Sequence, residues 1–509
     1  MASKFREQRN RLLRLHSLVG VFIAFFLFVV CFSGTFSLFS HELARWVDGD
    51  VRIKLSENLP SLDERFTGFL KDAPEGAEFP LIVLNFPTEN TPYYDMMALA
   101  AASGPPKQMK GRWSGSDAST LDMHGNTLPE WLAFFHTDLW LPYPFGRSIV
   151  GITGILLLLI VVTGFFMHRQ PIKDSFKWRP NKNLMTLLLD SHSSLGLWGL
   201  LFHFVTAFTG AVLGLSSLVG AIFTVLAYSD GNHAELEPFP LPEFEAQGVV
   251  SPSITPDEVS HIVKEATGVT PAILIAINYG KDSGIYRVYH EVEKNMVRFG
   301  VIDIQASNGV ILSQGEAPAN FAARTYASVL PLHTASYGGI WLKVVYGVLA
   351  TSLSLIIITG VMMWLERANA LDGAKKDERL LNVMSKLSVG VCAGFPLAVV
   401  TTLYIEQFIT VAPAERAFAI GTSVFSIWVS AMMFSFLMKK TAAALRGLLA
   451  LTALILAGLP VLNYLVYGDG ISALLSTGSH AVIIADVVFL LLAAGLALIV
   501  RTLKRESAK

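Results

Sequence analysis

Eight long apolar runs dominate the pattern of hydrophobic and polar positions along the chain. Each is long enough to cross a hydrocarbon core of about 30 Å as a helix of about 20 residues. The runs lie at 17–40, 147–167, 194–227, 340–364, 386–409, 417–438, 446–466 and 479–500. The pattern predicts eight transmembrane helices, of which the third is longer than the membrane requires and must tilt or protrude.

Two segments between the runs, at 41–146 and 228–339, are more polar and predict soluble domains. In the second, Thr255-Pro256-Asp257-Glu258 is typical of a helix start with a capping box. Alternating positions then predict strands at 272–279, 284–291, 296–303 and 310–314. In the first segment, 79–86 and 93–99 are candidate strands. Neither segment has a nucleophile and a base at a recognisable spacing.

Composition agrees with a membrane protein. The 509 residues are 52% hydrophobic and only 16% charged, and the mean hydropathy is +0.50. The only cysteines, Cys31 and Cys392, lie inside apolar runs, which excludes a disulfide framework and a cysteine-ligated cluster. The net charge of −1 neither favours nor excludes binding of nucleic acid. We expect no nucleic acid among the partners. The first apolar run has no evident cleavage site and is expected to remain as a helix.

Basic residues predict the orientation in the membrane. They collect in segments that fall on one side of an eight-span protein: 4–14, 169–182, 375–386, 439–446 and 501–505. The opposite short loops are poor in them, since 410–416 has only Arg416 and 467–478 has none. Because cytoplasmic loops carry the excess of Lys and Arg, we expect a bacterial inner-membrane protein with both termini in the cytoplasm and both soluble segments in the periplasm.

One module occurs twice in the chain. In each copy a histidine is followed by glycines four and eighteen residues later, then by an outer segment, a second histidine and a Thr-Gly pair. The positions of the first copy, each followed by its counterpart in the second, are His16/His192, Gly20/Gly196, Gly34/Gly210, His136/His333 and Gly164/Gly360. Both copies run outward and then inward, so the pattern predicts parallel repeats related by an axis along the membrane normal.

Equivalent residues of parallel repeats lie at equal depth. His16 and His192 are therefore expected at the cytoplasmic end, and His136 and His333 at the outer end. Two imidazoles that face each other across a pseudo-twofold axis are what bis-histidine haem ligation needs. The first two glycines of each copy would let a flat macrocycle or a neighbouring helix approach closely.

Two further histidines break the repeat. His168 ends the second span, and His203 lies eleven residues after His192, about 16 Å along a straight helix. An ionisable group at that depth is a functional candidate. The cytoplasmic-side ligands could come from His16, His168, His192 and His203, and the sequence does not settle which two. Taken singly, such histidines are also ordinary helix-end residues or hydrogen-bonding groups. For Glu406 and Asp486, a buried polar contact is favoured over a proton or quinone site.

Several short motifs then carry a family resemblance, by their order and spacing. They are Leu15-His16, Ser33-Gly34, Phe135-His136, Thr163-Gly164, His168-Arg169, Phe176-Lys177-Trp178-Arg179-Pro180, Leu189-Asp190-Ser191-His192, Leu201-Phe202-His203 and Leu332-His333. The chain resembles the PepSY-associated transmembrane family over residues 11–367, and within it the iron-regulated group that includes ferrisiderophore reductases. The segment 254–314 is similar to a PepSY domain, and 49–130 to a degenerate second copy.

The resemblance implies a mainly α-helical polytopic membrane protein with two periplasmic α+β PepSY-like domains. The expected plan is a cytoplasmic N-terminus and first span at 1–40, a degenerate PepSY-like domain at 41–146 and two spans at 147–227. A PepSY domain at 228–339 and a fourth span at 340–367 follow. The C-terminal region 368–509, with the last four spans, carries no motif of the family.

The resemblance also implies a haem-containing reductase that passes electrons across the membrane to ferric iron held by a siderophore or another chelate. We expect two haems of the b type, because no Cys-x-x-Cys-His attaches haem covalently. The chain has no Gly-x-Gly-x-x-Gly or phosphate loop, so electrons would come from a quinol or a cytoplasmic donor. The alternatives are a redox-inactive anchor whose PepSY domains bind peptides or a periplasmic protein, and a transporter.

Overall fold

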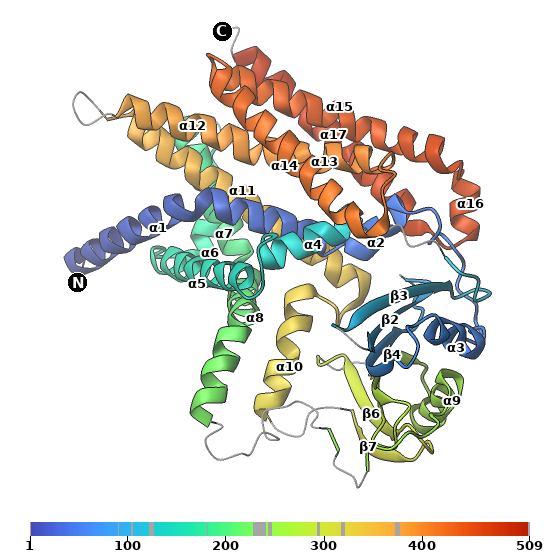
Figure 1. The fold of residues 1–509 in the computed structure, drawn as a ribbon. Coiled ribbons are helices and arrows are strands. Elements are labelled where there is room, and N and C mark those ends of the chain that lie inside the picture. The colour runs from blue at the N-terminus through green and yellow to red at the C-terminus, as the bar shows by residue number, and fades with distance from the viewer. Residues whose placement is uncertain are drawn as a thin grey trace.

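The computed structural model shows a helical body with a β-sheet at one end (Figure 1). It describes residues 2–89, 91–102, 105–121, 127–180, 182–227, 241–242, 247–292, 296–316, 321–371 and 377–506. The predicted start of the second soluble segment, at 228–240, lies outside the described residues. The helix α1 begins, and α17 ends, at sides of the body remote from the sheet (Figure 1). The placement of both termini in the cytoplasm stays a prediction.

The eight predicted spans all correspond to helices. Within the described residues, seven helices are long and apolar enough to cross a membrane, and a bent pair makes an eighth if its two helices form one span. The seven are α1 (Ala2–Ser37), α5 (Phe145–Phe166), α11 (Gly339–Asn369), α12 with α13 (Glu378–Cys392, Gly394–Glu406), α14 (Pro413–Leu437), α15 (Thr441–Tyr467) and α17 (His480–Glu506). The bent pair is α7 (Leu184–Trp198) with α8 (Leu200–Ala227).

The third span is broken, whereas we predicted one continuous helix. Its two halves meet at Gly199 with a bend of 69°. A Cβ at Gly199 would lie 2.4 Å from Cε1 of His203, so only glycine leaves room for that ring at the bend. The separation of His192 and His203 expected from a straight helix therefore does not hold.

The two soluble segments, which we predicted as two domains, contribute strands to one continuous sheet. The sheet has the order β3-β2-β1-β4-β5-β6-β7, and all of its pairs are antiparallel. β1 of the first segment pairs with β4 of the second, with Val83 opposite Ile275. The strands are β1 (Glu78–Asn85), β2 (Tyr93–Ala101), β3 (Lys107–Ser114), β4 (Pro271–Tyr279), β5 (Ile285–Glu291), β6 (Phe299–Gln305) and β7 (Ile311–Gly315).

We call the β1–β4 pairing the seam between the two segments. The helices on one face of the sheet, α3 (Asp63–Lys71) and α9 (Pro256–Thr267), also contact each other across it. Asp257 accepts a hydrogen bond from the backbone N–H of Leu62, and Asp63 accepts one from the N–H of Asp257. Each segment thus supplies a carboxylate to the first turn of the other segment's helix, where free N–H groups favour negative charge. The predicted capping box of α9 is confirmed.

Further short helices that we did not predict lie between the spans. They are α2 (Ser40–Val47), α4 (Leu128–Asp138), α6 (Pro171–Ser175), α10 (Phe321–Thr334) and α16 (Ile471–Ser476). Thr127 and Glu130 form a capping box at the start of α4. Two of these helices matter for function, because α4 carries His136 and α10 carries His333.

Candidate functional site

The first pair of repeated histidines meets inside the membrane body. His16 of α1 and His192 of α7 have ring centroids 6.2 Å apart, with the ring planes at 85°. Nδ1 of each ring lies 3.0 Å from a backbone carbonyl oxygen of a neighbouring span and 3.1–3.2 Å from a threonine hydroxyl. These partners are Ile160 and Thr163 of α5 for His16, and Ile356 and Thr359 of α11 for His192. The two rings are thus held in equivalent ways, as the repeat predicts.

The second pair, His136 and His333, lies where α4 and α10 adjoin the spans. We call it the outer pair, and His16 with His192 the inner pair. The ring centroids of His136 and His333 are 6.1 Å apart, and the planes make only 22°. Nδ1 of His136 lies 2.9 Å from the carbonyl oxygen of Val30, and Nδ1 of His333 lies 2.9 Å from Oγ1 of Thr209. That hydroxyl donates its own proton to the carbonyl of Val205, so it accepts from His333.

These hydrogen bonds fix the protonation of the rings. A carbonyl oxygen only accepts, so Nδ1 carries the hydrogen and Nε2 keeps its lone pair. Histidines that bind metals usually donate their other N–H to a carbonyl or carboxylate in this way. Among the described residues, no hydrogen bond to Nε2 is found in any of the four rings. The Nε2 atoms are therefore the available ligands.

The spacing of both pairs fits a metal between the rings. An imidazole nitrogen binds a transition metal such as zinc at about 2.0–2.1 Å, and the centroid lies about 1.1 Å behind it, so two axial rings have centroids about 6.2–6.4 Å apart. Packed aromatic rings share this range of distance, so the oriented Nδ1 atoms carry the argument. Within the described ranges, no three His, Cys, Asp or Glu side chains gather as a metal site. Haem needs only two protein ligands.

Glycines of the repeat lie against all four rings. A Cβ at Gly34 would be 2.7 Å from the His136 ring, and one at Gly210 would be 3.2 Å from His333. At the inner pair, a Cβ at Gly164 would be 3.2 Å from the His16 ring, and one at Gly360 would be 3.2 Å from the His192 ring. By contrast, Gly20 and Gly196, one turn after the inner histidines, have no atom within 4 Å of such a Cβ. The space next to these two glycines is open.

Replacing Gly34 by alanine should disturb the outer pair selectively. The new methyl group would overlap the His136 ring, and overpacking of this kind costs about 1–3 kcal/mol unless the ring moves. If each pair holds a haem, as the family resemblance implies, Gly34→Ala should lower haem binding at the outer pair while the inner pair keeps its spectrum. The matched control is Gly458→Ala in α15, where a Cβ meets no atom within 4 Å. Equal haem content and unchanged spectra in both variants would contradict the assignment.

His168 and His203 lie outside both pairs. Nδ1 of His168 contacts the carboxylate of Asp174 at 3.2 Å, and Lys177 beside that carboxylate holds the pKa of Asp174 below its usual range. His203 is buried, with Nε2 at 3.5 Å from Oγ of Ser352 on α11. Of the four cytoplasmic-side candidates, the structure therefore brings together His16 and His192.

A buried aspartate paired with a more exposed arginine lies near one histidine of each site. Asp138 follows His136 by two residues, is 1% exposed and receives two hydrogen bonds from Arg147. Asp190 precedes His192 by two residues, is 3% exposed and receives three from Arg179. Each pair joins its histidine helix to a neighbouring segment, and charge-assisted bonds of this bidentate kind are geometrically specific.

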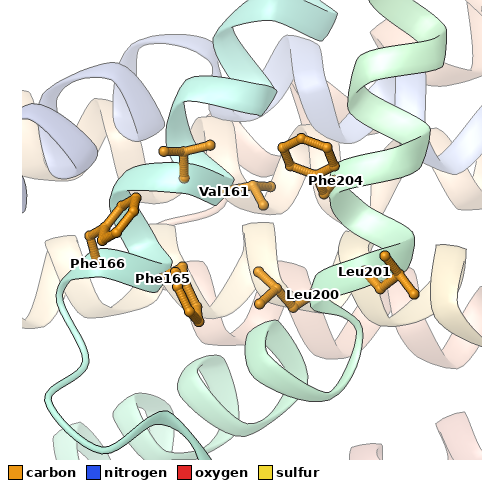
Figure 2. Close-up of a pocket in the computed structure, with 7 residues that line it drawn as sticks. Val161, Phe165, Phe166, Leu200, Leu201 and Phe204 are labelled. Atoms are coloured by element: carbon orange, nitrogen blue, oxygen red, sulfur yellow. The ribbon is translucent and has the colours of Figure 1, made fainter.

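An apolar groove lies at the end of α5, the helix whose Ile160 and Thr163 contact His16. Figure 2 shows its lining residues. The groove lies between the end of α5 and the start of α8, next to the bend at Gly199, and has a volume of about 320 Å³. Its lining residues are Val161, Val162, Phe165, Phe166, Leu200, Leu201 and Phe204. Phe165 directly follows Gly164, where a Cβ would lie 3.2 Å from the His16 ring. The exposed side chains of Phe166 and Leu201 leave the groove open on its outer face.

Part of this site was not visible in the sequence. The short helices that carry His136 and His333 have no long apolar pattern, and the Nδ1 partners lie on other spans. The repeated Thr-Gly pairs were the available signal, since their glycines contact the inner rings and their threonines bond them.

Comparison with known proteins agrees with this architecture. The chain is 26% identical to an uncharacterised protein of Pseudomonas aeruginosa over an alignment of 333 residues. The alignment covers 63% of this chain and 82% of the relative. The sequence pattern of the PepSY-associated transmembrane region matches residues 13–367, which include both histidine pairs and the whole sheet. The chain therefore belongs to the PepSY-associated transmembrane family.

Proposed function

We propose that the two histidine pairs each hold one b-type haem, and that the protein passes electrons across the inner membrane to ferric iron chelated in the periplasm, as by a siderophore. The observation that carries the proposal is the repeated geometry. At both levels two imidazoles lie 6.1–6.2 Å apart, with Nδ1 bonded to another element and Nε2 left for a metal.

The chain holds the two levels at a fixed separation. His16 and Val30, which binds His136, are fourteen residues apart on α1, so the levels differ by about 21 Å along that helix. Haem would supply a one-electron couple at each level. The protein's contribution is to fix the rings, to exclude water and to carry the second level on α4 and α10, which follow β3 and β7 in the chain (Figure 1). A bulky chelate could then be reduced without crossing the membrane.

The electron donor would act at the inner pair. The groove in Figure 2 has only apolar lining residues and adjoins the helix that contacts His16. These properties favour a quinol, which is soluble in the membrane, over a water-soluble cytoplasmic donor.

A visible absorption spectrum tests the proposal directly. The purified protein should show low-spin b-type bands that sharpen on reduction with dithionite, because two imidazoles are strong axial ligands. Acid acetone should extract the colour, since no cysteine motif binds the macrocycle. A colourless protein that expressed with a normal haem supply would overturn the proposal and favour a peptide-binding membrane anchor.

A further inference from the structure

The two histidine pairs are built alike but differ in the angle between their rings. The inner planes are nearly perpendicular, at 85°, and the outer planes are nearly parallel, at 22°. Two parallel repeats would give equivalent surroundings to His136 and His333. The Nδ1 partners of the outer pair do differ, since His136 bonds the carbonyl of Val30 and His333 bonds the hydroxyl of Thr209, and the helices that carry the two rings also have different neighbours.

The C-terminal region distinguishes α4 from α10. α4 packs against α13 and α14, which follow the repeated part of the chain. Trp131 of α4 is fully buried and lies against Gly421 of α14, where a Cβ would be 2.9 Å from its Nε1. Its ring stacks on Phe135, the residue before His136, at 4.9 Å and 11°. The main contacts of α10, by contrast, are with α8, a helix of the repeat.

Glu406 makes the polar part of this contact. It ends α13, is 1% exposed, and both carboxylate oxygens accept the backbone N–H of Leu128, at 3.0 and 3.1 Å. Leu128 is the first residue of α4. Arg416 of α14 donates to the same carboxylate at 3.3 Å and to the carbonyl of Ile409 at 3.0 Å. A buried carboxylate at a helix N-terminus, itself neutralised by an arginine, holds the helix firmly because leaving it unpaired is costly.

We propose that Glu406 is a positioning residue for His136: it anchors the first turn of α4 to the C-terminal region and so sets the outer rings nearly parallel. The inference rests on the proposed function, because the angle between the two rings affects only a metal that both rings bind. It also gives the C-terminal region 368–509, which carries no motif of the family, a role in the site.

The ring angle has an electronic consequence. The π orbitals of two parallel imidazoles interact with the same iron d orbital and split it from its partner, which gives a rhombic low-spin EPR signal. Perpendicular imidazoles interact with both orbitals equally and give a signal with one large g value. The wild-type protein should therefore show two different ferric signals, the rhombic one from the outer pair.

EPR of the oxidised full-length protein tests the proposal. His333→Ala and His192→Ala first assign the two signals. Glu406→Gln, which keeps one acceptor for Leu128 but loses the charge, should shift the outer signal and leave the inner signal and the haem content unchanged. Glu406→Leu should shift it further. The control is Asp486→Asn, which changes a carboxylate of the same region that binds Trp46 of α2 and not α4.

The outcomes separate the two proposals. If both signals are present and Glu406→Gln and Asp486→Asn leave the outer one equally unchanged, Glu406 does not position His136. If the Glu406→Leu protein fails to fold, the outer EPR signal of Glu406→Gln alone tests whether Glu406 positions His136. Wild-type protein without any haem signal would overturn the proposed function itself.

Discussion

His333→Ala is expected to remove one of two low-spin haem signals and to leave the other intact. His333 would provide one of the two axial nitrogens of the outer pair, and a single remaining imidazole, His136, binds haem much more weakly. The inner pair lies about 21 Å away along α1 and shares no hydrogen bond with the outer rings. Haem content per protein, measured as the pyridine complex, should fall by about half, as expected for the loss of one of two axially ligated groups.

The matched control for this loss is His261→Ala. His261 lies on α9 of the sheet domain with a side chain that is 73% exposed, so its removal should change neither haem content nor spectrum. Full haem content with an unchanged spectrum in His333→Ala would show that the outer assignment is wrong. A loss of both signals would indicate that the variant is misfolded, which the elution profile of the purified protein would reveal.

The second large effect is expected in proteoliposomes with reductant inside and a ferric hydroxamate outside. The reduced protein should be reoxidised by the chelate, and Fe(II) should be captured by a ferrous-specific dye in the outer solution. One electron moves to each Fe(III), and the product binds hard oxygen ligands more weakly because its charge density is lower. No pocket of high specificity is needed for this release.

The gallium(III) hydroxamate is the control for the second prediction. It has the same charge and coordination as the ferric chelate but accepts no electron under these conditions, so the reduced spectrum should persist. Reoxidation by oxygen, with no response to any ferric chelate, would exclude a reductase. It would leave electron delivery to a periplasmic partner as the function of the haems.

The sequence predicted the features that depend on local pattern. All eight spans and six of the seven strands correspond to predicted segments, because burial in lipid or in a sheet imposes its period on a continuous stretch. The repeat also predicted that His136 and His333 pair, because duplication places equivalent residues at equal depth. It placed His16 and His192 at one depth but left open which two of His16, His168, His192 and His203 pair. The structure brings His16 to His192 and His136 to His333.

Features that depend on distant contacts could not be predicted. The pairing of β1 with β4 joins residues almost two hundred positions apart, and each strand alone reads as part of its own small domain. The bend at Gly199 depends on the ring of His203 beside it. We expected Glu406 to make a buried polar contact, which is confirmed, but its partner Leu128 lies 278 residues away and no local pattern names it.

The seam between β1 and β4 restricts how the two repeats can move. It ties the first copy to the second by backbone hydrogen bonds within the sheet, and the exchanged carboxylates of Asp63 and Asp257 reinforce it. Transport by alternating access requires one repeat to rotate as a rigid body against the other. The sheet opposes that motion, because its β1–β4 hydrogen bonds would have to break or deform. Electron transfer makes the opposite demand, because it is favoured by a frame in which donor and acceptor sites keep their distance.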